Sequence, residues 1–146
     1  MKQKLWREQI TSEQIHKIHE DYRDFYFMLE KLVDAYRFNI IFDGHTMNPK
    51  AKRPEISIGT EFIPSFYLPI VKSMAKKLER LGYTPVRFNA PYSGGYVLQW
   101  LARKFPDVFI FSMEINKKMY IDMRKHKVLK QKVQKLSHDL TNIFDI

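Results

Sequence analysis

The chain has 146 residues, and we expect residues 1–146 to form a single domain. Hydrophobic residues make up 45% of it, enough to bury a core, yet no apolar run approaches the length of a membrane span. There is no cysteine, which excludes disulfides and thiolate metal sites, and no secretory signal, so we expect a cytoplasmic protein. The net charge of +9 could attract nucleic acid, an anionic membrane or an acidic small molecule.

An apolar stripe predicts a long helix after Thr11. Thr11, with Gln14 three residues later, resembles a capping box. Apolar side chains follow at alternating spacings of three and four residues: Ile15, Ile18, Tyr22, Phe25, Leu29, Leu32 and Tyr36. The run from His16 through His19 to Glu20 could supply two metal ligands on one face of this helix. A solvated polar face also explains them, because no further ligand stands at a characteristic spacing.

The stretch 38–47 predicts a buried strand that ends in Asp43-Gly44-His45. Its apolar residues run almost unbroken, as in a parallel strand that is covered on both faces. Gly44 would let the backbone turn sharply, which places Asp43 and His45 at the carboxyl end of the strand, where ligands bind in open α/β sheets. His45 could therefore be a metal ligand or a base, or only a surface histidine in a turn.

Strands and helices alternate along the rest of the chain. Strands are predicted at 55–59, 84–89 and 108–115, and helices at 68–81, 97–104 and from about 122 onward. The loop before the second strand carries Lys50, Lys52 and Arg53, which could meet an anionic substrate or simply be solvated. The alternation indicates an α/β fold, a layered mostly parallel or mixed sheet flanked by helices.

Two further features stand at strand ends and would share the sheet edge with His45. The turn at 89–96 contains adjacent glycines, which permit a ligand to approach the backbone closely, although most such pairs are only turns. Glu114 ends the most apolar strand, where a carboxylate is costly unless it has a role or a partner. An ion pair with Lys117 or Lys118 is the alternative to a functional role.

This order of motifs resembles the N-formylglutamate amidohydrolase family over nearly the whole chain. The matching stretches are 43–47, 57–60, 82–83, 89–96 and 114–120, together with the Leu5-Trp6-Arg7 lead-in and the long helix. The resemblance implies a fold like that of the zinc carboxypeptidases. It also implies one catalytic zinc and hydrolysis of the formyl amide of N-formylglutamate or a related N-acyl amino acid.

The resemblance also implies roles for individual residues. His45 matches a zinc ligand, and Glu114 matches the catalytic carboxylate, which would take the proton of a zinc-bound water. The residues expected to bind substrate are Asn89, Gly94, Gly95 and Asn116.

The chain departs from the family pattern in one respect. Family members carry an upstream section with a Pro-His-Ser/Ala-Gly-like turn, an acidic second ligand and an Asp-x-Asn-Arg-like stretch. A catalytic zinc needs about three protein ligands, and only His45 matches by motif. We therefore expect a truncated carboxyl-terminal part of such an enzyme, which is either completed by a separately encoded amino-terminal half or uses substitute ligands among His16, His19 and Asp43. Because missing strands would leave a sheet edge exposed, we also expect self-association. A catalytically silent remnant that at most binds a partner is the alternative.

A basic tail provides a third, less favoured hypothesis, nucleic-acid binding. Its positive residues lie within 117–135, with Asp122 as the only acid among them: Lys117, Lys118, Arg124, Lys125, Lys127, Lys130, Lys132 and Lys135. Such a run is usually a solvated helix face. It also lacks the interleaved aromatic residues that bind single strands.

Overall fold

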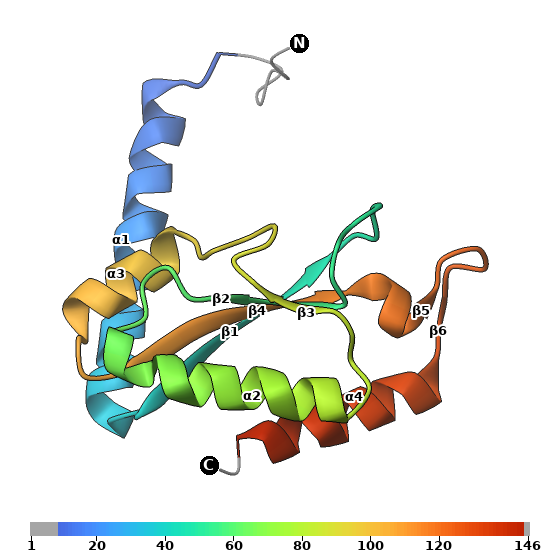
Figure 1. Ribbon diagram of the computed structural model, residues 1–146. Coiled ribbons are helices and arrows are strands. Elements are labelled where there is room, and N and C mark those ends of the chain that lie inside the picture. The colour runs from blue at the N-terminus through green and yellow to red at the C-terminus, as the bar shows by residue number, and fades with distance from the viewer. Residues whose placement is uncertain (1–8, 145–146) are drawn as a thin grey trace. The chain divides into compact units, whose positions relative to one another are not determined.

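The computed structural model describes residues 9–144, which fall into two compact units with a boundary after Phe38 (Figure 1). The first unit contains α1 (Ser12–Tyr36), which begins at the predicted capping box. The Gln14 amide donates to Thr11 Oγ1 at 3.2 Å, and the Thr11 amide donates to Gln14 Oε1 at 2.9 Å. The Leu5-Trp6-Arg7 lead-in lies outside the described residues.

The second unit is built on a four-stranded sheet with the order β1-β4-β2-β3. The strands are β1 (Ile40–Met47), β2 (Ile56–Gly59), β3 (Val86–Phe88) and β4 (Phe109–Asn116). The helices are α2 (Leu68–Arg80), α3 (Tyr96–Lys104) and α4 (Lys130–Ile143), with short 3-10 turns at Ser65–Tyr67 and Lys117–Met119. β1 is parallel to β4 and β3 to β2, whereas β2 is antiparallel to β4, so the predicted α/β fold with a mixed sheet is confirmed. Within residues 9–144, none of the helices has the length and apolar character that a membrane crossing needs.

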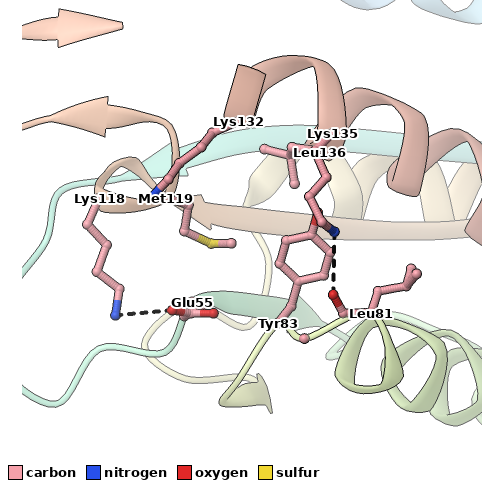
Figure 2. A pocket seen from close by; sticks show the side chains of 9 residues that line it. Glu55, Leu81, Tyr83, Lys118, Met119, Lys132, Lys135 and Leu136 are labelled. Carbon is pink, nitrogen blue, oxygen red and sulfur yellow. Dashed lines mark hydrogen bonds and ion pairs between the residues drawn. The ribbon is translucent and has the colours of Figure 1, made fainter. Parts of the chain in front are cut away.

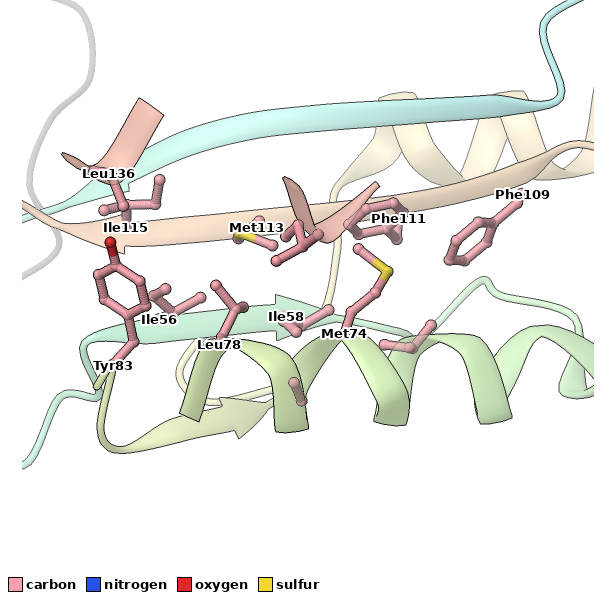
Figure 3. Packing of buried hydrophobic residues seen from close by; sticks show 13 residues of the cluster. Ile56, Ile58, Met74, Leu78, Tyr83, Phe109, Phe111, Met113, Ile115 and Leu136 are labelled. Carbon is pink, nitrogen blue, oxygen red and sulfur yellow. The ribbon is translucent and has the colours of Figure 1, made fainter. Parts of the chain in front are cut away.

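One face of the sheet packs against α2 and α4 to form the core (Figure 3). The strands and helices contribute buried side chains that include Ile56, Ile58, Val71, Met74, Leu78, Phe109, Phe111, Met113 and Ile143. Alternate residues of a strand point to opposite faces. The residues of β4 between these apolar ones therefore project from the other face, on which α3 contacts the sheet.

β1 differs from its prediction in two respects. The backbone does not turn at Gly44, because the strand pairs with β4 in register as far as Met47. The strand also lies at the sheet edge, with Ile40 38% and Phe42 37% exposed, so the prediction of burial on both faces is wrong. The apolar run identified the strand but carried no information on its place in the sheet. Phe42 nevertheless packs its ring against Phe111, with ring centroids 5.4 Å apart.

The last helix begins later than predicted. Asp122 starts a tight turn instead of a helix, because its Oδ1 accepts hydrogen bonds from the Arg124 amide at 3.0 Å and the Lys125 amide at 3.1 Å. This turn joins β5 (Ile121–Asp122) to β6 (Lys127–Val128) in a small antiparallel hairpin. The periodic apolar pattern belongs only to α4, which follows the hairpin.

The outer edge of β1 provides a first testable prediction. Within residues 9–144 this strand of 8 residues pairs only with β4, so its other edge presents unpaired backbone groups. We expect the purified chain to self-associate at micromolar concentrations through this edge, as measured by light scattering. Ile40→Lys should shift the chain towards monomer, because lysine protects natural edge strands. Val133→Lys, at an equally exposed apolar residue of α4, serves as the control. A wild-type chain that stays monomeric at high concentration would refute the prediction.

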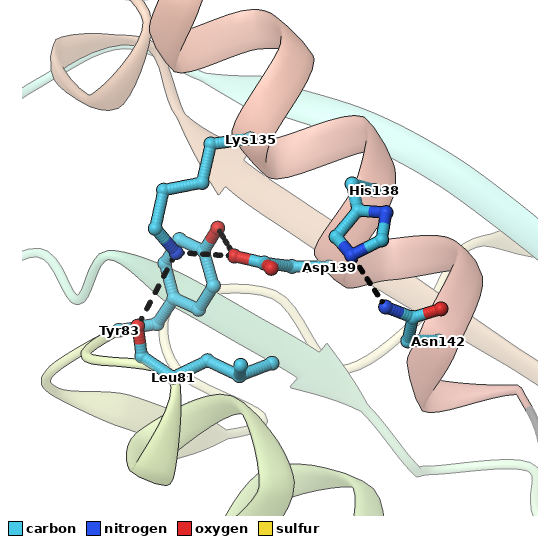
Figure 4. Close-up of polar contacts among 6 residues, drawn as sticks. All are labelled: Leu81, Tyr83, Lys135, His138, Asp139 and Asn142. Atoms are coloured by element: carbon cyan, nitrogen blue, oxygen red, sulfur yellow. Dashed lines mark hydrogen bonds and ion pairs between the residues drawn. The ribbon is translucent and has the colours of Figure 1, made fainter.

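A buried polar contact fastens α4 to the loop after α2 (Figure 4). Tyr83 Oη donates to Asp139 Oδ2 at 2.5 Å, and Lys135 forms an ion pair with the same oxygen. Lys135 also donates to the carbonyl of Leu81 at 3.4 Å. Burial would raise the pKa of Asp139, but the hydrogen bonds from Lys135 and Tyr83 outweigh it and hold this pKa below its ordinary value.

Tyr83→Phe should lower the free energy of unfolding at pH 7 by about 1–3 kcal/mol, because a buried carboxylate loses a hydrogen-bond donor. The pKa of Asp139 is depressed in the folded state, so this stabilisation is present above the unfolded pKa of about 4 and disappears as the pH falls through the folded value. Urea unfolding at several pH values measures both effects. Tyr36→Phe, on an exposed ring, is the control. Equal stabilities of the Tyr83 variant and wild type at pH 7 would contradict the prediction.

Candidate functional site

The sheet face opposite the core carries polar side chains on three adjacent strands. His45 of β1 pairs in register with Glu114 of β4, which pairs on its other side with Ser57 of β2. Two residues earlier in the same strands, Asp43 of β1 pairs in register with Ser112 of β4. Residues in register share a face, and residues two apart along a strand point the same way, so these side chains project together. The structure thus brings His45 and Glu114 onto one surface.

Asp43 and His45 form a contact that remains open to solvent. Asp43 Oδ1 lies 2.9 Å from His45 Nε2, and the two side chains are 32% and 55% exposed. The carboxylate fixes the orientation of the ring and favours a proton on the nitrogen that faces it. The pair can therefore present an oriented imidazole to a bound molecule.

Glu114 is half-buried beside this pair. Burial is the main cause that raises the pKa of Glu114 above its ordinary value. The charge of His45 lowers this pKa, the carboxylate of Asp43 raises it, and the guanidinium of Arg53 lowers it. A carboxyl group with a raised pKa, set among charged neighbours at the surface, suits proton exchange with a substrate.

The turn between β3 and α3 closes the polar face beside β2. The Ala90 amide donates to Ser57 Oγ at 3.3 Å, so the turn lies directly against that strand. A Cβ on Gly59 would lie 2.8 Å from the carbonyl oxygen of Ser93 and would collide with Ser112 Oγ. Glycine at this position therefore permits the close approach of the turn. The turn therefore borders the polar face beside β2, whereas His45 on β1 is exposed to solvent.

Both predicted glycines lie in this turn. Gly94 has φ +144°, and a Cβ there would lie 3.1 Å from the ring of Phe62, so a side chain would be strained. Gly95 is the N-cap of α3, and nothing lies within 4 Å of a Cβ built on it. The space beside Gly95 is thus open, and its role in substrate binding stays a prediction.

The predicted asparagines fasten the loops around the polar face. Asn89 Oδ1 accepts from the Thr60 amide at 2.8 Å, and its Nδ2 donates to Thr60 Oγ1 at 2.9 Å. Asn116 is buried, donates to the carbonyl of Pro54 at 3.0 Å and accepts from the Lys118 amide at 3.2 Å. Through these hydrogen bonds both asparagines hold neighbouring loops in place. Contact of either residue with a substrate remains a prediction.

Two cations belong to loops beside Glu114: Arg53, in the basic loop that could meet an anionic substrate, and Lys117, which the sequence suggested only as an ion-pair partner of Glu114 or as part of the basic tail. Arg53 Nη1 donates to the Asn48 carbonyl at 2.9 Å, and its Nη2 donates to Tyr92 Oη at 3.2 Å. Lys117 Nζ donates to Asn48 Oδ1 at 3.0 Å. In the sequence, their only sign of a functional role is their position, because Arg53 stands just before β2 and Lys117 directly after β4. Solvated lysines and arginines are common at such positions, so this sign is weak.

A separate pocket of about 290 Å³ lies where the core meets the end of α2 (Figure 2). Its lining includes Tyr83 and Leu136 from the core, so it belongs to the helix-covered side of the sheet. Its Lys118 lies 3.5 Å from Glu55, and its Lys135 is paired with a carboxylate of α4. Two of the three lysines that line the pocket, with Lys132 as the third, thus already have anionic partners, and the pocket holds no pair of proton-exchanging groups like His45 and Glu114, so the face around Glu114 is the better candidate for a functional site.

The resemblance implies a zinc ion, which needs several donor side chains close together. Asp43 and His45 are neighbouring donors, yet the described residues contain no group of three or more histidine, aspartate or glutamate side chains that could hold a metal. His16, one of the proposed substitute ligands, contacts Glu20 on the exposed surface of α1, with 3.3 Å between His16 Nε2 and Glu20 Oε1. Because a catalytic zinc needs about three protein ligands, these residues do not fit zinc by themselves.

We therefore expect the chain purified without chelators to contain well under one equivalent of zinc. Elemental analysis after gel filtration measures this directly, with a zinc enzyme of known content as the control. A stoichiometric zinc that survives dialysis would contradict the expectation, and it would point to His16, His19 or Asp43 as substitute ligands.

Comparisons with known proteins agree with the predicted family. The family model described as N-formylglutamate amidohydrolase matches residues 1–121. The crystal structure of N-formylglutamate amidohydrolase from Ralstonia eutropha JMP134 superposes with a TM-score of 0.70 and 18% sequence identity. The match covers 94% of this chain and 54% of that one, so this chain spans about half the length of the solved protein. No curated protein sequence matches the chain. The match of the family model over most of the sequence shows that the chain belongs to the N-formylglutamate amidohydrolase family.

Proposed function

We propose that this chain carries part of the active site of a hydrolase that cleaves the formyl amide of N-formylglutamate or a related N-acyl amino acid. The observation that carries the proposal is the in-register pairing of His45 and Glu114 on an open polar face. Family membership supports the reaction class. Because the chain spans about half the length of the solved relative, the activity of the complete enzyme is part of the proposal.

In this proposal Glu114 transfers protons. Its carboxylate takes a proton from the attacking water as the new C–O bond forms, and it delivers that proton to the amide nitrogen as the C–N bond breaks. The products are formate and glutamate. The raised pKa of Glu114 favours the second step, because it makes the protonated carboxyl group easier to form before it protonates the leaving nitrogen. Asp43 orients His45 beside this carboxyl group.

We also propose zinc as the cofactor, with His45 as one ligand. The described residues supply too few donors for a complete zinc site. The remaining donors would have to come from outside residues 9–144 or from a partner chain.

The experiment is a formate-release assay with N-formylglutamate as substrate and zinc in excess. The chain is assayed alone and after coexpression with the product of an adjacent upstream reading frame, if the gene neighbourhood contains one. We expect hydrolysis in at least one of these forms. If no form releases formate from any N-acyl amino acid, the chain is a silent remnant, which the incomplete set of metal donors would then explain.

A further inference from the structure

We infer that Arg53 and Lys117, which both bind Asn48, form the subsite that holds the carboxylates of an acidic substrate. This inference rests on the proposed function and names residues that neither the resemblance nor the comparisons assign. Three chain segments come together at one edge of the sheet. Asn48 follows β1, Arg53 precedes β2, and Lys117 follows β4.

The topology of the sheet brings these segments together. β1 and β4 are parallel and end side by side, and β2 begins there because it is antiparallel to β4. Asn48 binds Arg53 through its carbonyl at 2.9 Å and Lys117 through its Oδ1 at 3.0 Å. The two cations are thus fixed to one residue close to Glu114, where the charge of Arg53 acts on the carboxyl group.

The guanidinium of Arg53 is oriented and still has free donors. Its Nη2 donates to Tyr92 Oη at 3.2 Å, and its Cζ lies 5.5 Å from the centre of the Tyr92 ring. An arginine has five N–H donors in a rigid fork, and the Asn48 and Tyr92 contacts use two of them. The remaining donors can bind a carboxylate in the bidentate geometry that arginine favours.

Among the described residues neither cation forms an ion pair at contact distance, although the charge of Arg53 acts on Glu114. The hydrogen-bond acceptors of Arg53 and Lys117 are neutral oxygens, although both cations are partly buried. The neighbouring Lys118 is different, because it pairs with Glu55 at 3.5 Å. A charge that is partly removed from water interacts more strongly with a counter-ion than a fully solvated charge does. A substrate with two carboxylates, such as N-formylglutamate, would supply one for each cation.

The test measures Kd by calorimetry for N-formylglutamate and for N-formylnorvaline, which lacks the side-chain carboxylate. The variants are Arg53→Met, Lys117→Met and the double variant, with Lys118→Met as the matched control. We expect wild type to prefer N-formylglutamate, and each single variant to bind it about 10- to 100-fold more weakly, as charge-assisted hydrogen bonds are lost. The double variant should bind both compounds equally, and Lys118→Met should behave as wild type.

Two outcomes overturn the subsite while the proposed function stands. One is a wild-type chain that binds both compounds equally well. The other is a double variant that keeps the wild-type preference for N-formylglutamate. If wild type binds neither compound, the proposed function fails and the subsite fails with it.

Discussion

Glu114→Gln should lower the hydrolysis of N-formylglutamate by about 10²–10⁴-fold in any active form of the protein, the usual contribution of a general acid–base group. Glutamine keeps the shape of the side chain but cannot exchange a proton. Glu114 is only half-buried and lies on the polar face of β4, away from the core, so the substitution should leave the fold unchanged. Initial rates, together with circular dichroism of each variant, measure the effect.

The matched control for this prediction is Glu79→Gln, on the exposed surface of α2, which should keep the wild-type rate. If Glu114→Gln also remains fully active, Glu114 is only a charged residue at the rim of the sheet. The catalytic assignment would then be wrong, although the family membership would stand.

Phe111→Ala should lower the free energy of unfolding by about 3–5 kcal/mol, the usual cost of removing a buried aromatic ring. Phe111 is 1% exposed, and its ring centroid lies 4.9 Å from that of Phe109 and 5.4 Å from that of Phe42. It therefore joins neighbouring residues of β4 to the edge strand that carries His45. Urea unfolding monitored by circular dichroism measures the change.

The control for the core is Phe66→Ala, since Phe66 is 64% exposed. Its stability should remain within about 0.5 kcal/mol of wild type. Equal costs for the two substitutions would show that the cluster around Phe111 does not form the core of this sheet.

Local patterns predicted the parts of the fold that depend on neighbouring residues. The capping box at Thr11 located the start of α1, and Gly82, with φ +94°, follows the end of α2 as a helix-ending glycine does. The unbroken apolar run of β4 identified the central strand, and the polar Glu114 within it pointed to the candidate site. Each of these signals lies within a few residues of the feature that it predicts.

Features that depend on distant contacts were not predictable in the same way. The apolar run of β1 was the same whether that strand lay at the centre of the sheet or at its edge. Lys117 is bound to Asn48 across 69 residues, so no local pattern could pair them. The hairpin before α4 was missed because its two strands have only 2 residues each.

The most direct test of the candidate site is a titration of the ¹⁵N-labelled chain with N-formylglutamate, followed by two-dimensional NMR. It locates the bound molecule even in a chain that turns over slowly. The account predicts that the largest shifts fall on the amides of His45, Glu114, Arg53 and Lys117, on and beside the polar face of the sheet. Shifts that instead cluster around Tyr83 and the pocket of Figure 2 would contradict it, as would the absence of any shift at millimolar ligand.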